Sequence, residues 1–286
     1  MASYNVGGIG TNPIEWATKT WNCATGCDKV SAGCKFCYAA PLAERLQRMG
    51  NARYKNGFKL TLHPDKLDEP RTWRTPEWVF VNSMSDILHA NIPDSFILDA
   101  FAAMDSANWH RYQVLTKRAE RWADISGLVL DRFGRWPRNV LPGVSVENQR
   151  HGLPRIAQLG LAGDADTCRM LSVEPLLESL CDGDVGGLAQ QLVAARVGWV
   201  ITGGEAGWHA RPAVEDWFRE VRDACALASV PFFHKQWGGV GTTKEHKRGG
   251  ILAVLDGVLH HAMPDVWHAS PPGRGVAQLS LLAASS

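Results

Sequence analysis

The sequence predicts an α/β protein, a partial or complete TIM-like barrel with a cysteine-rich N-terminal loop and a small C-terminal hairpin extension. Apolar runs alternate with helical segments from about residue 78 onward, which indicates parallel strands joined by right-handed crossovers. Polar side chains follow each apolar run, and sites of barrel proteins are built at the carboxyl ends of the strands. The length of 286 residues also suits one α/β barrel.

The elements follow in order along the chain. Residues 77–86 hold a β-branched and aromatic run that stops in a cluster of Asn, Ser and Asp, which predicts a strand. Residues 95–107 have apolar side chains at helical spacing, which predicts the next helix. The same alternation then continues, with strands expected over 111–118, 139–148, 167–175, 197–207 and 231–239 and helices over 119–133, 150–163 and 213–230.

We expect a single barrel domain over residues 1–268, followed by a flexible tail that has few bulky residues at regular spacing, 269–286. The domain contains the cysteine loop, 23–39, and an insertion with short strands before the second barrel strand, 52–76. Near its end, the dipeptide Asp256-Gly257 predicts the turn of a β-hairpin.

The composition is that of a soluble globular protein, with 45% hydrophobic and 21% charged residues and a net charge of +1. No signal peptide and no apolar run of about eighteen residues is present, so we expect a cytoplasmic protein with reduced thiols. The segment between Lys29 and Pro64 is locally basic. It is either a solvated helical face or a phosphate-facing surface, and its basic residues are Lys29, Lys35, Arg45, Arg48, Arg53, Lys55 and Lys59.

Four of the seven cysteines, Cys23, Cys27, Cys34 and Cys37, lie within fifteen residues. A disulfide framework is the least favoured interpretation, because the cysteine count is odd and the expected compartment is reducing. Structural zinc takes two cysteine pairs, but the six residues between these pairs make a short loop for a zinc ribbon. An iron–sulfur cluster held by the last three cysteines would keep one iron open for a ligand.

The cysteine loop resembles the cluster loop of the radical S-adenosylmethionine (SAM) superfamily, with a longer first gap, Cys27-x6-Cys34-x2-Cys37, and Phe36 before the last cysteine. Over residues 14–265 the chain is similar to a phage and bacterial family of uncharacterised three-cysteine proteins, itself distantly similar to spore photoproduct lyase. The similarity rests on the segments TWNCATGCDKVSAGCKFCYA, VFVNSMSD, QVLTKR, GVSVEN, LSVEPLLE, VITGGEAG and PFFHKQWGG.

The resemblance implies a partial (β/α)6 barrel, a [4Fe–4S] cluster on Cys27, Cys34 and Cys37, and SAM bound at its open iron. In the family a proline commonly occupies the position of Cys23, which implies that Cys23 is not a ligand. Gly203-Gly204-Glu205 resembles the amine-binding motif of the superfamily, but it follows the sixth strand and not the second.

We therefore assign the SAM contacts to other polar strand ends. Ser83, Ser85 and Asp86 are expected to bind the amine, and Lys117 the carboxylate. Tyr38 is expected near the adenine, and the ribose hydroxyls are assigned to Ser145, Glu147 and Asn148.

The remaining polar strand ends are assigned to the substrate: Glu174, Glu205 and Lys235, with Trp208 and His209 stacking on a base. The predicted function is a radical SAM enzyme acting on a nucleobase, in DNA rather than RNA, by repair of a thymine photoproduct or by base modification. A small nucleotide or a peptide is the other substrate class. An electron donor such as flavodoxin or ferredoxin is the expected partner.

The alternative is a non-enzymatic, zinc-stabilised nucleic-acid-binding protein that uses all four clustered cysteines alike. The other three cysteines, Cys168, Cys181 and Cys225, are expected to be buried structural thiols.

Overall fold

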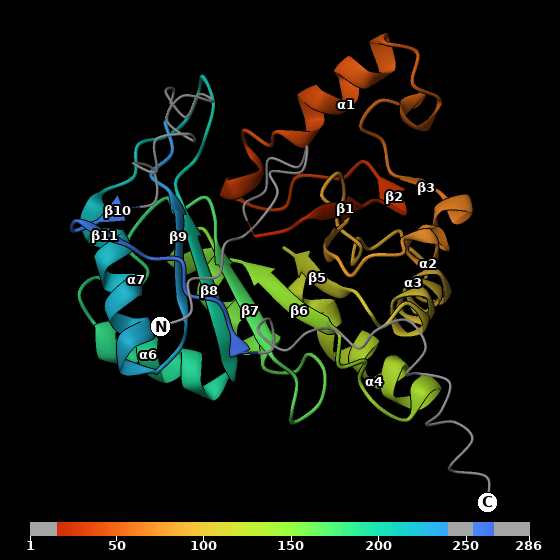
Figure 1. Ribbon diagram of the computed structural model, residues 1–286. Coiled ribbons are helices and arrows are strands. Elements are labelled where there is room, and N and C mark those ends of the chain that lie inside the picture. The colour runs from red at the N-terminus through yellow and green to blue at the C-terminus, as the bar shows by residue number, and fades with distance from the viewer. Residues whose placement is uncertain (1–15, 240–253, 266–286) are drawn as a thin grey trace, which may run out of the picture.

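In a computed structural model, which describes residues 16–239 and 254–265, a curled, parallel, seven-stranded sheet forms a half-barrel (Figure 1). The strands neighbour one another in sequence order, and every pairing is parallel. All carboxyl ends therefore lie along one edge. The strands are β1 (Lys19–Trp21), β4 (Trp78–Val81), β5 (Arg111–Thr116), β6 (Val140–Ser145), β7 (Arg169–Val173), β8 (Val197–Gly203) and β9 (Phe232–Gln236).

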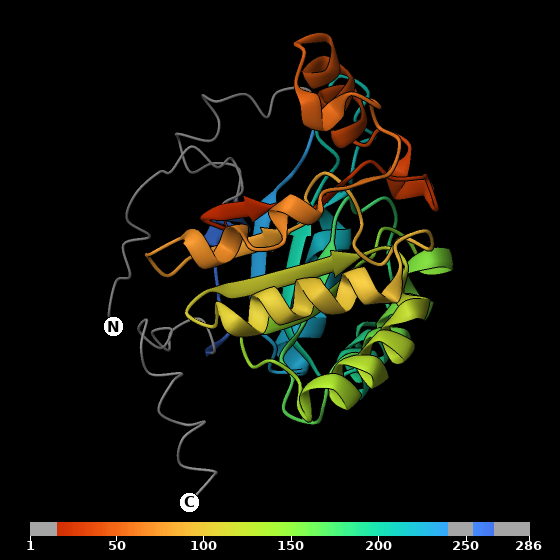
Figure 2. The ribbon, with the colours of Figure 1, turned by 90° about the vertical axis from the view of Figure 1, so that its right-hand side faces the viewer.

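Helices cover the outer face of the sheet, and the main hydrophobic core lies between the two layers (Figures 1 and 2). Asn148 caps one of these helices, because its side chain accepts a hydrogen bond from the His151 amide. Gly134 ends another in a left-handed conformation, φ 68°. The helices are α3 (Asp94–Ser106), α4 (Trp122–Phe133), α5 (Gln149–Leu159), α6 (Val185–Ala194) and α7 (Glu215–Leu227).

The predicted fold class is confirmed, and each strand and helix predicted between residues 77 and 239 is present. Their bounds are shorter than predicted, except that α3 keeps the predicted length and begins one residue earlier. Two elements of the half-barrel lie outside the predicted segments. The strand β1 has only three residues, too few to show an alternating pattern. The helix α6 contains two glycines, which weaken its helical signal.

The connection from β1 to β4 carries a small lobe that stands over the carboxyl edge of the sheet (Figures 1 and 2). Gly26 anchors it with φ +84°, and a Cβ there would lie 2.3 Å from the Lys59 carbonyl oxygen. The predicted insertion contains one short strand and short helical segments. The lobe consists of β2 (Ala24–Thr25), η1 (Ala32–Cys34), α1 (Ala39–Arg48), η2 (Ala52–Tyr54), β3 (Thr61–Leu62), η3 (Pro64–Lys66) and α2 (Glu69–Thr72).

The C-terminal hairpin is also confirmed. Its strands β10 (Val254–Leu255) and β11 (Val258–Leu259) are antiparallel, and the turn residues Asp256 and Gly257 both have positive φ. The predicted tail lies outside the described residues. Within the described ranges, every helix is too short or too polar to cross a bilayer.

Candidate functional site

A cavity of about 730 Å³ lies between the carboxyl edge of the sheet and the α1 lobe. Its apolar side comes partly from α1 and the segment after it, including Leu42, Leu46, Tyr54 and Phe58. The predicted site residues that line it are Cys27, Cys34, Cys37, Tyr38, Ser83, Ser85, Asp86, Lys117, Ser145, Glu174 and Lys235. Residues spread over more than two hundred positions therefore share one chamber.

Of the four clustered cysteines, one is buried in the core and three line the cavity. Cys23 is fully buried, with its Sγ atom 3.6 Å from the Asn82 side-chain oxygen, and burial raises the pKa of its thiol to about 12. Cys27, Cys34 and Cys37 are free, half-buried thiols on the cavity wall. Across the described residues, no three Cys, His, Asp or Glu side chains form a group that could hold a metal ion. The three thiols thus share the cavity without converging on one point.

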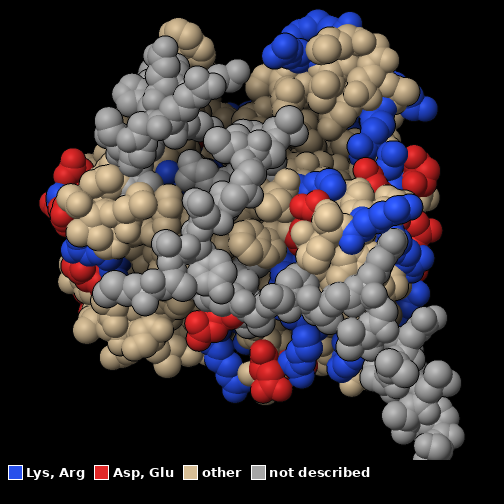
Figure 3. Space-filling view, in the orientation of Figure 1, with Lys and Arg blue, Asp and Glu red and all other residues tan. Residues whose placement is uncertain are grey.

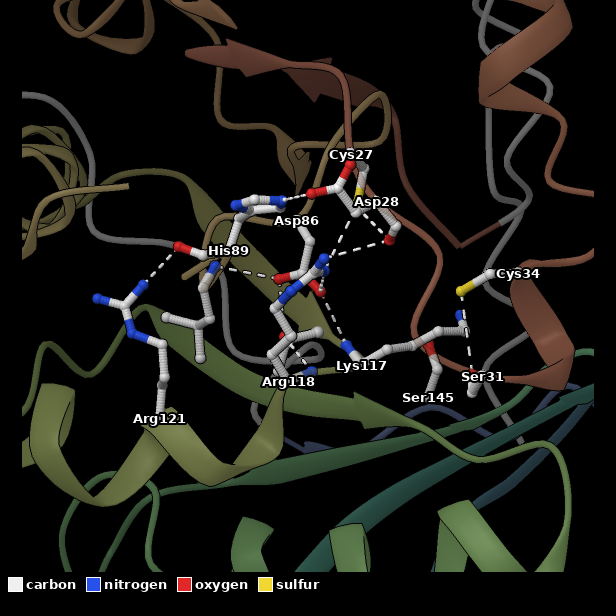
Figure 4. Close-up of polar contacts among 12 residues, drawn as sticks. Cys27, Asp28, Ser31, Cys34, Asp86, His89, Lys117, Arg118, Arg121 and Ser145 are labelled. Carbon is white, nitrogen blue, oxygen red and sulfur yellow. Dashed lines mark hydrogen bonds and ion pairs between the residues drawn. The ribbon is translucent and has the colours of Figure 1, made fainter. Parts of the chain in front are cut away.

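Arg118, which follows β5, fixes the first of these thiols (Figure 4). Its guanidinium donates to the Cys27 Sγ atom at 3.3 Å, to the Asp28 carbonyl oxygen at 3.2 Å and to Asp86 Oδ2 at 3.0 Å. Burial, and then the negative charge of Asp86, raises the pKa of Cys27 to about 11, while Arg118 opposes both. Sequence reasoning selected the neighbouring Lys117 and did not identify Arg118 as a site residue.

Asp86, predicted to bind the SAM amine, is fully occupied by the protein itself. Its carboxylate accepts hydrogen bonds from Thr116 Oγ1 at 2.7 Å, from the Leu88 and Lys117 amides at 3.0 Å each, and from Arg118. A carboxylate has about four acceptor positions. Asp86 therefore joins the ends of β4 and β5 and has no acceptor left for a ligand.

Glu147 lies beneath the cysteine loop and outside the cavity lining. Its carboxylate is completely buried, pairs with Arg155 at 2.7 Å, and accepts a hydrogen bond from the Gly33 amide at 3.4 Å. A Cβ atom on Gly33 would meet this side chain at 3.3 Å. Asn148, assigned with it to the ribose, instead caps α5.

Glu205 has the same kind of arrangement. Arg211 binds its carboxylate with two guanidinium nitrogens, at 2.8 and 2.6 Å, and donates to the Ala32 carbonyl oxygen at 2.9 Å. Although burial acts in the opposite direction, the Arg211 contacts lower the pKa of Glu205. We call the three pairs Asp86–Arg118, Glu147–Arg155 and Glu205–Arg211 the loop clamps, because each contacts the cysteine loop.

The other residues assigned to SAM do line the cavity. The Ser85 hydroxyl donates to the Ala24 carbonyl oxygen at 3.0 Å, and the Tyr38 hydroxyl to the Ser83 carbonyl oxygen at 2.6 Å. Lys117 extends in the direction of Cys34 in Figure 4, and its ammonium has no partner within the part of the chain that the structure describes. Ser145 completes this wall.

The residues assigned to the substrate separate into two places. Glu174 and Lys235 form an ion pair of 2.7 Å on the cavity wall. Trp208 is 86% exposed, and the ring of His209 stacks on Phe36 with 5.7 Å between centroids. These two aromatic residues are outside the cavity lining, on the loop that also carries Arg211.

Most of the basic side chains singled out in the sequence are exposed on the lobe around α1 (Figure 3). Arg53 is half-buried and donates to the Asn22 carbonyl oxygen. On α1, Arg45 and Arg48 lie opposite the stripe that faces the cavity, since Ala39, Ala43 and Leu46 pack inward. The exposed basic residues, which form no ion pair within the described ranges, are Lys29, Lys35, Arg45, Arg48, Lys55 and Lys59.

The three remaining cysteines lie apart from the cavity lining. Cys225 is buried as expected, but Cys168 and Cys181 are only half-buried. Burial raises the pKa of Cys168 and of Cys181 to about 11. Cys168 directly precedes β7 and so lies at the amino end of the sheet, opposite the cavity.

A protein family described as "Protein of unknown function (DUF5131)" matches residues 11–264. Similar solved structures include spore photoproduct lyase as a cysteine-to-serine mutant, with 16% identity and a TM-score of 0.45 over 72% of this chain and 60% of that one. They also include spore photoproduct lyase complexed with dinucleoside spore photoproduct, with 15% identity and a TM-score of 0.44 over 72% of this chain and 59% of that one. The match thus spans about three fifths of the length of these structures. Among curated proteins, none matches the sequence.

Proposed function

The chain belongs to the DUF5131 family, and from the cysteine loop and its cavity we propose that it is a radical SAM enzyme. The observation that carries the proposal is the division of the clustered cysteines. Cys27, Cys34 and Cys37 face one cavity at the carboxyl edge of the sheet, while Cys23 is turned into the core. Three thiolates are the ligands expected for a [4Fe–4S] cluster with one open iron.

The chemistry of the donor set fits such a cluster. The thiols are free and half-buried, and the guanidinium of Arg118 places positive charge beside the first of them. When bound, the cluster and SAM supply a 5′-deoxyadenosyl radical that abstracts hydrogen from a substrate C–H bond.

The residues of the chain would then bind and orient SAM. Lys117, whose ammonium has no described partner and lines the cavity, is the cation for the SAM carboxylate. Ser83 and Ser85 are assigned to its amine, Ser145 to the ribose and Tyr38 to the adenine. The apolar wall contributed by α1 limits the entry of water.

For the substrate we propose a nucleobase, in DNA rather than RNA, that undergoes repair of a thymine photoproduct or modification. The exposed basic side chains on the outer surface of the α1 lobe support this, because they would contact the phosphate backbone of a nucleic acid bound along the lobe. A flavodoxin or ferredoxin would deliver the electron. A zinc-stabilised binding protein is less well supported, since it would use Cys23 in the same way as the other three cysteines.

The test is anaerobic purification with iron, sulfide and zinc analysis, followed by incubation with dithionite and SAM. We expect about four irons per chain and formation of 5′-deoxyadenosine. The variant Cys34→Ala should lose the iron and the formation of 5′-deoxyadenosine. The matched control Cys23→Ala should keep the iron and the activity. Stoichiometric zinc with intact SAM, or equal loss in the two variants, would contradict the proposal.

A further inference from the structure

Glu174 and Lys235 form the one ion pair, among those described, whose two side chains both line the cavity without touching the cysteine loop. Glu174 follows β7 and Lys235 lies in β9, so their contact passes over the end of the intervening strand β8. The Lys235 Nζ atom donates to Glu174 Oε2 at 2.7 Å. The side chain of Glu174 is 16% exposed and that of Lys235 is 23% exposed, which leaves both accessible from the cavity.

Gly203 makes this contact possible. It ends β8, and a Cβ atom at this position would lie 2.9 Å from Glu174 Oε2. On the other side of the carboxylate, the Ser172 hydroxyl is 3.5 Å from Oε1. Residues of three neighbouring strands thus position the pair. Apart from the contact between Lys235 and Glu174 and the one with Ser172, no described hydrogen bond involves either side chain.

Both groups keep unused hydrogen-bonding capacity. An ammonium has three donors and a carboxylate about four acceptor positions. Lys235 uses one donor, and Glu174 accepts from Lys235 and Ser172 only, within the described residues. The cavity wall therefore offers a donor directly beside an acceptor. A complementary ligand edge has an acceptor next to an N–H group, as where a carbonyl oxygen adjoins a ring N–H.

Resting on the nucleobase substrate proposed above, we propose that Glu174 and Lys235 bind the lactam or imide edge of the base. The ring N–H donates to Glu174, and the adjacent carbonyl oxygen accepts from Lys235. Thymine, uracil and guanine present this edge. At the same ring position cytosine and adenine present a nitrogen lone pair to the carboxylate, and they satisfy both groups only by shifting until the amino group donates to Glu174 and the ring nitrogen accepts from Lys235. For a base held at the first position, hydrogen bonds to charged groups are strong enough to make the discrimination about 10- to 100-fold.

The experiment is equilibrium dialysis of nucleosides against the anaerobically purified full chain. Thymidine and deoxyguanosine carry the N–H group, whereas deoxycytidine and deoxyadenosine do not, and N3-methylthymidine has lost it. We expect at least one of the first two to bind about 10-fold tighter than the other three. In Glu174→Gln the amide can turn to donate or to accept, so the preference should fall to about 1- to 2-fold.

Two further variants complete the test. Lys235→Met should weaken binding of the preferred nucleoside about 10-fold, because its carbonyl oxygen loses a charged donor. The exposed Glu120, outside the cavity lining, provides the matched control Glu120→Gln, which should keep the full preference.

Equal binding of thymidine and N3-methylthymidine together with no preference for deoxyguanosine would overturn the inference. So would an unchanged preference in Glu174→Gln, or no nucleoside binding at all. Iron content and SAM cleavage by the same preparations report the proposed function separately. A chain that cleaves SAM but does not discriminate the bases would refute only the role of this pair.

Discussion

The two sides of the cavity use the same residue type in opposite ways. On the side of the cysteine loop, Asp86, Glu147 and Glu205 each pair with an arginine and hold the loop. On the distal wall, Glu174 pairs with Lys235 and keeps acceptor positions that face the cavity. The role of a carboxylate at a strand end therefore depends on its basic partner. Where the pair also contacts the cysteine loop, the carboxylate is structural, and where it does not, the carboxylate keeps positions for binding.

Burial explains why the difference has energetic consequences. The side chains of the pair Glu147–Arg155 are 0% and 7% exposed. Removing one charge from such a pair leaves the other buried and uncompensated. Water reaches part of the distal pair, so either of its charges could be removed at lower cost.

The largest expected effect is at Glu147, and it tests the contrast between the two sides of the cavity. Glu147→Gln should lower the free energy of unfolding by about 3–5 kcal/mol, because Arg155 stays charged in a buried position. Urea unfolding of the metal-free chain measures it through the midpoint. The control Asp99→Asn removes the exposed pair with Arg132 and should cost less than about 1 kcal/mol. Equal midpoints for the two variants would contradict the role of the loop clamps.

The next effect concerns the guanidinium beside Cys27. Arg118→Lys keeps a positive charge near Asp86 but loses the fork that contacts both the Cys27 Sγ atom and the Asp28 carbonyl oxygen. Loss of such a supporting contact typically costs about 10- to 100-fold in metal affinity. Iron retained against a chelator is the measurement.

Arg121→Lys is the matched control, because Arg121 contacts the His89 and Ile92 carbonyl oxygens and no thiol. If both variants retained iron as well as the parent chain does, Arg118 would have no part in positioning Cys27 for the proposed cluster.

A smaller, pH-dependent effect distinguishes the two faces of β9. Lys235 points into the cavity, whereas its neighbour His234 is fully buried on the other face, against Phe218 and Trp237. Burial lowers the pKa of His234 to about 4 from its ordinary value of 6.5. Below pH 6.5 the unfolded chain binds a proton that the folded chain does not, so stability falls as the pH falls.

Between about pH 6.5 and 5, above the range of ordinary carboxylates, His234 should contribute about 1.4 kcal/mol of lost stability per pH unit. The slope of the unfolding free energy in this window should decrease by that amount in His234→Gln. His63 and His261, whose pKa values are also lowered by burial, account for a remaining slope. An unchanged slope would mean that His234 is already protonated in the folded state.

The smallest expected effect is on the distal wall. Glu174→Gln should change the free energy of unfolding by only about 1 kcal/mol, the net value of one hydrogen bond. Comparison of its urea midpoint with that of Glu147→Gln sharpens the contrast between the two walls. A loss as large as the one at Glu147 would make Glu174 a fourth structural carboxylate.

The sequence was sufficient to predict which residues lie at the carboxyl edge of the sheet. It was insufficient to predict which of these side chains are already occupied by contacts within the protein. Alternation of strands and helices places all strand ends on one edge, so Ser83, Lys117, Glu174 and Lys235 could be expected in one cavity. The occupation of Asp86 depends on several nearby groups that no periodic pattern reveals.

The other two carboxylates depend on long-range contacts. Glu147 reaches Gly33 across 114 positions, and the pair Glu205–Arg211 reaches Ala32 from Arg211. Such contacts have no local sequence signature. They are fixed only when the sheet has brought its edge under the lobe.

The contact between Arg211 and Ala32 spans 179 positions, and it has a consequence for biosynthesis. The cysteine loop emerges from the ribosome before β4 to β9, and the sheet then grows strand by strand away from it. The arginines that hold the loop arrive in the order 118, 155 and 211. The nascent thiols consequently stay open to oxidation and to stray metal ions until residue 211 has been translated, which would place loading of the proposed cluster after that point, as a maturation step.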